Sequence, residues 1–195
     1  MTSRRIVSLT AALVIATGLA AGTASSATAA TSSTTSSMTP AYPVKSCKFW
    51  RANLGPWGPV RSVKKPSLVW TVPGTQSGDS VVLSTYGDRL SQCWKILGGF
   101  GNGELELQRA NTGMCVAVKG ASRKVNTSIV LYPCLSKTRE LFKVYTNPNN
   151  GRTLFQNVNS GLCIQAKGGL VSGHRLIQAK CSNYGNWQSW TRTNP

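Results

Sequence analysis

The sequence predicts an all-β fold built from three copies of a unit of about 48 residues. Two cysteine-bounded segments, 115–134 and 163–181, begin 48 residues apart and have similar flanking residues. Short apolar or β-branched segments alternate with Gly, Asn, Ser and Pro clusters, and no window keeps the apolar stripe of an amphipathic helix. Because such a unit cannot bury its apolar face alone, we expect the copies to close into one disulfide-stabilised barrel.

The chain begins with the features of a secretory signal peptide. Arg4 and Arg5 form a basic start, residues 6–21 are mostly apolar, and Ala27 and Ala29 precede a cleavage site. We therefore expect residues 1–30 to be removed and the mature protein to be secreted, by either the general or the twin-arginine route. Residues 31–40 read as a Ser/Thr-rich linker. No later segment has 18 consecutive apolar residues, which predicts no transmembrane span in the mature protein.

The three copies are expected at about 51–98, 99–146 and 147–195, within a domain of residues 41–195. In the second copy, the segments 105–107, 116–118, 129–131 and 141–144 have the composition of strands, so the copies together predict twelve strands. The same spacing places Ser67 and Tyr86 of the first copy where the other copies carry cysteines. The first copy is therefore expected to lack an internal disulfide.

An even number of cysteines in an exported chain favours three disulfides. The repetition predicts that each cysteine-bounded segment closes its own loop, which leaves one further pair. The expected bonds are Cys115 to Cys134, Cys163 to Cys181 and Cys47 to Cys93. The chain has no Cys-x-x-Cys pair and a single histidine, His174, so the sequence predicts neither a metal site nor a cofactor.

Three tripeptides, at the same position in each copy, resemble the signature of a known family. Gln92-Cys93-Trp94 and Gln188-Ser189-Trp190 match the QxW signature of ricin-B-type lectin domains, and Glu140-Leu141-Phe142 is a degenerate copy. The similarity covers about residues 60–195. This resemblance implies a β-trefoil fold. Members of the family usually bind sugars, either alone or as modules attached to enzymes and toxins. It also implies that Trp94, Phe142 and Trp190 are core residues.

The sugar sites of that family use three positions in each copy. These are an Asp two residues after the first cysteine, an aromatic residue shortly before the second, and an Asn just before QxW. By the 48-residue spacing, this chain has Val69, Ala117 and Gln165 at the first position, Ser84, Tyr132 and Ala179 at the second, and Ser91, Arg139 and either Asn186 or Trp187 at the third.

No copy keeps the complete set, so ordinary galactose recognition is not expected. Gln165 can still form hydrogen bonds with a sugar, and aromatic and amide side chains follow Cys181. The main candidate site is therefore the third copy, with Gln165, Tyr184, Asn186 and Trp187, and Tyr132 is a secondary candidate. The alternative is a structural trefoil in which Tyr132 and Trp187 simply pack.

Composition narrows the function further. The chain has 22 Lys+Arg, 5 Asp+Glu and one His, a net charge of +17. Few carboxylates leave little room for acid–base catalysis, and we expect Glu104 and Glu106 to be solvated charges on one strand. The prediction is a non-catalytic carbohydrate-binding protein. The alternative is a basic scaffold that binds anionic polymers or a partner protein, as toxin subunits do. No motif for specific nucleic-acid recognition is present, and the oligomeric state stays open.

Overall fold

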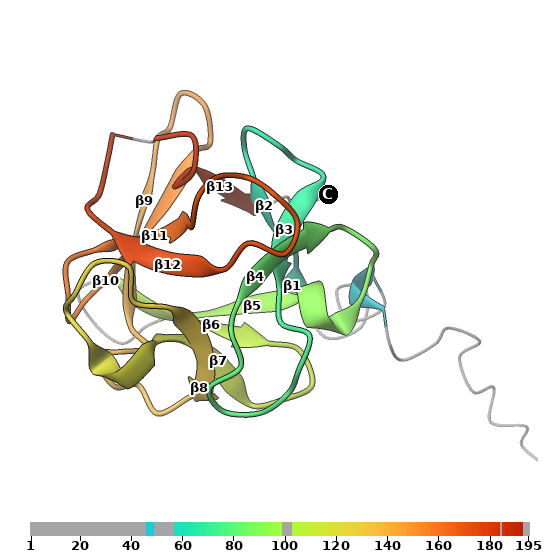
Figure 1. Ribbon diagram of the computed structural model, residues 1–195. Helices are drawn as coiled ribbons and strands as arrows, with labels where there is room; N and C mark the ends of the chain where they lie inside the picture. Colours follow the sequence, from blue (N-terminus) through green and yellow to red (C-terminus); the bar gives the residue numbers. More distant parts are fainter. Residues whose placement is uncertain (1–45, 49–56, 99–102, 184, 193–195) are drawn as a thin grey trace, which may run out of the picture. The chain divides into compact units, whose positions relative to one another are not determined.

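The computed structural model describes residues 46–48, 57–98, 103–183 and 185–192, all within one compact unit, Pro40–Pro195. The expected signal peptide and linker lie outside the described residues. Thirteen strands and two short 3-10 helices are present in the described part of the chain (Figure 1). None of the helices described there has the length and hydrophobicity of a membrane span.

Each copy contributes one set of strands to the fold. The first copy forms β1 (Trp57–Gly58), β2 (Val60–Ser62), β3 (Leu68–Thr71), β4 (Val82–Thr85), the 3-10 helix η1 (Leu90–Gln92) and β5 (Trp94–Gly98). The second forms β6 (Glu104–Arg109), β7 (Met114–Val118), η2 (Lys119–Ala121), β8 (Ile129–Pro133) and β9 (Phe142–Thr146). The third forms β10 (Thr153–Asn157), β11 (Cys163–Ala166), β12 (Leu176–Ala179) and β13 (Trp190–Arg192).

The outer strands of the copies pair into a closed antiparallel ring. The order is β5, β6, β9, β10 and β13, and the run 57–62 joins the two ends, because β1 pairs with β5 and β2 pairs with β13. Only Pro59 separates β1 from β2, and proline has no N–H to donate to a strand ladder. This break gives thirteen strands in the described residues where the repeat pattern predicts twelve.

The remaining strands form three hairpins, β3–β4, β7–β8 and β11–β12. Isolated bridges connect each hairpin to the other two: Ser80 to Val130, Val82 to Arg175, and Ser128 to Ile177. The arrangement of a closed ring and three linked hairpins is a β-trefoil, which confirms the fold expected from the sequence.

The core lies where the three copies meet. The QxW aromatics Trp94, Phe142 and Trp190 are fully buried. Trp70 lies among them, with ring centroids 5.1 Å from Trp190 and 5.2 Å from Phe155. The apolar alternation of each strand thus fills one shared interior, as the repeat architecture requires.

Three disulfides tie the loops to this core, with the predicted pairing. They join Cys47 to Cys93, Cys115 to Cys134 and Cys163 to Cys181. The first closes the longest loop, with a separation of 46 residues, and attaches Ser46–Lys48 beside β5. Cross-links of this kind stabilise mainly by restricting the unfolded chain.

The strand register corrects the sequence alignment of the first copy. Arg61 pairs with Val69 as Gln108 pairs with Cys115 and Gln156 with Cys163, so Val69, and not Ser67, stands at the position of the first cysteine. The family's Asp position in the first copy is therefore Thr71 rather than Val69. The uniform 48-residue spacing fails here because the β3–β4 hairpin is shorter than its counterparts, while Ser84 keeps its expected place opposite Val69.

Candidate functional site

One backbone hydrogen bond repeats in all three copies and fixes the third family position. The N–H groups of Val72, Val118 and Ala166 donate to the carbonyls of Ser91, Arg139 and Trp187, at 3.0 Å each. Trp187 of the third copy is therefore the structural equivalent of Ser91 and Arg139. Asn186 lies one residue earlier, in the loop that contains the extra residue.

The buried amide of Gln188 organises the third copy. Its Oε1 accepts hydrogen bonds from the backbone N–H of Ser182 at 2.8 Å and the hydroxyl of Ser182 at 3.0 Å. Its Nε2 donates to the carbonyl of Lys180 at 2.7 Å and to Oε1 of Gln165 at 2.8 Å. Because a backbone N–H can only donate, the amide of Gln188 has one orientation.

That orientation also determines what Gln165 presents to a ligand. Its Oε1 already accepts a hydrogen bond from Gln188, so its Nε2 amide, a hydrogen-bond donor, points to no partner described here and can serve a ligand. The family's Asp at this position is an acceptor only. The third copy therefore retains a polar group at this position and adds a hydrogen-bond donor to it.

A pocket of about 300 Å³ opens beside Gln165. Its described lining consists of Gln165, Ser182, Gly185, Asn186, Trp187 and Gln188. The structure thus brings together three of the predicted site residues, Gln165, Asn186 and Trp187, whereas Tyr184 lies outside the described residues. Sequence reasoning missed Ser182 and Gly185, since the QxW signature says nothing of this loop, and the only signal was its extra residue.

Trp187 is the exposed aromatic surface of this pocket. The side chain is 46% exposed, in contrast to the fully buried QxW tryptophans. Its ring lies beside Gly169, where a side chain would bring its Cβ within 3.7 Å of Cζ2 of Trp187. A tryptophan that keeps about half its surface exposed at a pocket is suited to cover the apolar face of a sugar.

Tyr132 of the second copy does not line the pockets described in this structure. Its family Asp position is Ala117, which is fully buried and offers no polar side chain. The guanidinium of Arg139 lies 3.8 Å from the centroid of the Tyr132 ring and forms an ion pair with the buried Glu140. This hydrogen bond to Glu140 is the main cause that raises the pKa of Arg139. One face of Tyr132 is thus covered by its own chain, and Tyr132 lies in a different copy from Trp187.

In the first copy, the hydroxyl groups at the site position bond to the chain's own side chains. Nε2 of Gln92 donates to Oγ of Ser84 at 2.9 Å and to Oγ1 of Thr71 at 3.3 Å, and the two hydroxyls also contact each other. The guanidinium of Arg61 lies 4.1 Å from the centroid of the Tyr86 ring. The polar groups at this position therefore satisfy one another rather than face an open pocket.

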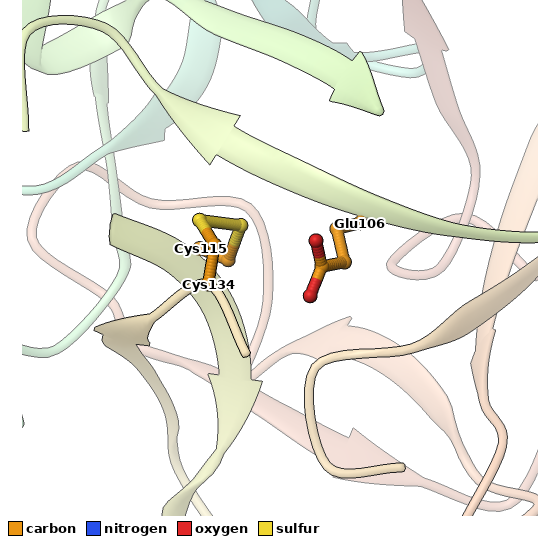
Figure 2. A group of neighbouring side chains, drawn as sticks. All are labelled: Glu106, Cys115 and Cys134. Carbon is orange, nitrogen blue, oxygen red and sulfur yellow. A yellow bond between two sulfur atoms is a disulfide. The ribbon is translucent and has the colours of Figure 1, made fainter. Parts of the chain in front are cut away.

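A cluster of Glu106, Cys115 and Cys134 has the composition of a metal site but not its chemistry. Its potential ligand atoms lie within 4.8 Å of one another, and Figure 2 shows the carboxylate of Glu106 beside the two sulfurs. Both sulfurs belong to one disulfide, so neither is the thiolate that binds a metal. Glu106 instead accepts a hydrogen bond from the backbone N–H of Ser136 at 2.8 Å.

The burial of Glu106 corrects the expectation of a solvated strand charge. Only 2% of its surface is exposed, whereas Glu104 is half-buried. Burial raises the pKa of the Glu106 carboxyl, the hydrogen bond from Ser136 opposes this, and the charge of Glu140 adds to it. β6 turns alternate residues to the same face, as expected, but that face lies under the segment around Ser136.

We expect the Glu106→Gln variant to gain stability over the native protein as the pH rises from 4 to 7. A raised pKa means that the folded protein binds more protons than the unfolded chain just above the ordinary carboxyl range, so native stability falls as the pH rises there. Glutamine keeps an oxygen for Ser136 and cannot ionise. Urea unfolding of both proteins at pH 4 and pH 7 measures the difference, and an equal difference at the two pH values would contradict the prediction.

The sequence and fold also match known proteins. Residues 90–179 match the family model described as a ricin-type beta-trefoil lectin domain-like domain. The trefoil fold and the three phased QxW positions agree with this match, so residues 90–179 are similar to ricin-type β-trefoil lectin domains. No curated protein gives a significant match.

Solved structures support the same fold at low sequence identity. The designed three-fold symmetric protein ThreeFoil has a TM-score of 0.66 at 18% identity, over 71% of this chain and 99% of its own. A mosquitocidal holotoxin gives 0.65 at 15%, over 72% of this chain. The Polyporus squamosus lectin, solved with the epitope Neu5Aca2-6Galb1-4GlcNAc, gives 0.61 at 14%, over 70% of this chain. This chain spans only 17% of the holotoxin chain and 48% of the lectin chain.

Proposed function

We propose that this chain is a secreted, non-catalytic protein that binds carbohydrate in the pocket of the third copy. The observation that carries the proposal is the meeting of Gln165, Asn186 and Trp187 in one pocket. An exposed indole covers the apolar face of a sugar ring, while amide groups orient its hydroxyls. The family of the domain and the carbohydrate complex of the Polyporus squamosus lectin support this ligand class.

Two further features support a secreted binding protein. Three disulfides in a chain of this size are typical of oxidising compartments, and the first 30 residues have the pattern of a signal peptide. The described lining of the pocket contains no carboxylate, imidazole or thiol that could act as an acid, base or nucleophile. The geometry therefore favours holding a sugar over reacting with it.

A second function, the binding of anionic polymers or a partner protein through a basic surface, is favoured by the charge. The chain has 22 Lys+Arg against 5 Asp+Glu, a net charge of +17, so its acidic side chains cannot neutralise most of its cations. Such a charge attracts polyanions, whose binding weakens steeply with salt.

A glycan and polysaccharide binding screen at about 0.15 M and about 0.5 M salt distinguishes the two functions. We expect a glycan to bind at both salt concentrations, and Gln165→Ala to weaken it about tenfold through the loss of the amide hydrogen bond. Gln76→Ala, an exposed glutamine of the first copy, is the matched control and should leave affinity unchanged. Binding to anionic polymers alone, lost at high salt and insensitive to Gln165→Ala, would overturn the carbohydrate proposal in favour of the scaffold.

A further inference from the structure

A second hollow in the third copy is surrounded by cationic side chains. It has a volume of about 390 Å³ and is lined by Lys167, Gly168, Gly173, His174 and Arg175. These residues form the loop between β11 and β12, whose ends are joined by a 2.9 Å hydrogen bond from the N–H of Lys167 to the carbonyl of Arg175. Three cationic or ionisable side chains are thus held around one concave surface.

The charges of this loop are not neutralised by acidic neighbours. All five carboxylates of the chain lie in the described residues, and the one ion pair found there is in the second copy. A further cation approaches from the first copy, because Nζ of Lys65 lies 3.5 Å from the carbonyl oxygen of Leu170. A concave surface that holds uncompensated positive charge attracts an anion.

Two glycines place this hollow directly beside the carbohydrate pocket. A Cβ built on Gly169 would lie 3.7 Å from the ring of Trp187, and one built on Gly168 would lie 3.7 Å from Cε1 of His174. Adjacent Cα atoms are only about 3.8 Å apart, so the indole and the imidazole flank a single dipeptide. The backbone φ angles of +69° and +111° at Gly168 and Gly169 favour glycine at both positions.

The corresponding loops of the other copies lack this combination. The first-copy loop carries Asp79 and no cation between Pro73 and Asp79. The second-copy loop is basic, but its Arg123 donates to the carbonyl of Asn159 at 2.7 Å, and Ala117 replaces the polar residue of the sugar position. Within the described residues, an exposed indole, a free amide donor and a cationic hollow meet only in the third copy.

We propose that the third copy binds an acidic carbohydrate, whose sugar ring rests on Trp187 and whose carboxylate or sulfate group occupies the hollow between Lys167 and Arg175. This inference rests on the proposed function and adds the class of ligand to it. Lys167 and Arg175 form charge-assisted hydrogen bonds to the anionic group, and the donor amide of Gln165 suits an oxygen-rich ligand. Glutamine at the family's Asp position also replaces the carboxylate that would repel such a ligand.

The single histidine of the chain allows the cationic hollow to be tested apart from sugar binding. His174 gives one imidazole signal in an NMR spectrum, since no other histidine is present. Titration of the purified protein with inorganic sulfate, against chloride at equal ionic strength, should shift that signal in a saturable way. The double variant Lys167→Ala/Arg175→Ala should raise the sulfate midpoint at least about tenfold. Arg89→Ala/Lys124→Ala removes the same charge at exposed sites of the other copies and should not.

A second arm uses pairs of oligosaccharides that differ only in charge. Galacturonic acid oligomers are compared with their methyl esters, and sulfated galactose oligomers with the unsulfated forms. We expect the charged member to bind about tenfold more tightly, and the Lys167→Ala/Arg175→Ala variant to remove that preference without loss of neutral binding. The uronate and sulfate pairs identify which acidic group is preferred.

The outcomes separate this inference from the proposed function. Neutral and acidic members bound equally, or a sulfate response no larger than that of chloride, would overturn the acidic ligand while leaving carbohydrate binding intact. A sulfate response without binding of any glycan would overturn both proposals and would leave an anion site on a scaffold.

Discussion

Replacement of Trp187 by alanine is expected to weaken carbohydrate binding by about tenfold to a hundredfold. The indole is the one aromatic side chain in the described lining of the pocket, and it lies beside Gly169. Its loss removes the contact with the apolar face of the sugar. The backbone carbonyl of residue 187, which accepts the N–H of Ala166, is unaffected by the change. Isothermal titration with a glycan identified by the screen measures the loss.

The matched control for this variant is Tyr145→Ala on β9. Tyr145 is also 46% exposed, and it does not line the pocket. Both substitutions should change the free energy of unfolding by only about 0.5 kcal/mol, as is usual for surface residues. Equal glycan affinity in the Trp187 and Tyr145 variants would mean that the ring merely packs, as the alternative of a structural trefoil requires.

The fold was predictable because it is encoded three times. The 48-residue spacing, the phased QxW tripeptides and the cysteines each point to the same three copies, and the disulfide pairing follows from the repetition. The buried QxW aromatics also follow from it, because one position per copy must fill the shared core. Because the same features recur in each copy, a wrong assignment in one copy is revealed by its disagreement with the other two.

What the sequence could not predict depends on pairing between strands. The shorter hairpin of the first copy moves its first-cysteine position from Ser67 to Val69, which only the strand register reveals. The choice of Trp187 over Asn186 as the equivalent of Ser91 and Arg139 likewise depends on a hydrogen bond from Ala166. Burial of Glu106 depends on the segment around Ser136, which lies 30 residues away in the chain.

The site position differs between the three copies, although the copies share one strand arrangement. In the first, hydroxyl groups close the site around Gln92, and in the second, Arg139 covers Tyr132. The third keeps Gln165 and Trp187 at an open pocket. The scaffold hydrogen bond before each QxW position is common to all copies, so the side chains and the loops around it determine which copy can hold a ligand.

Replacement of Trp70 by alanine is expected to destabilise the protein by about 3–5 kcal/mol, a large part of the roughly 5–15 kcal/mol that stabilises a typical domain. Trp70 is fully buried and contacts three other core aromatics, Trp94, Phe155 and Trp190. Its removal leaves a cavity where the copies meet, which a rigid barrel cannot close by collapse. Urea unfolding followed by tryptophan fluorescence and circular dichroism measures the loss.

Trp70→Phe separates the packing of this ring from its polar atom. The Nε1 group of Trp70 is buried and has no hydrogen-bond partner in the described residues, so its burial opposes folding. Phenylalanine keeps most of the ring contacts and removes that unpaired donor. We therefore expect Trp70→Phe to cost less than half as much as Trp70→Ala. Equal costs for the two variants would contradict this prediction and would show that the indole is required as a whole.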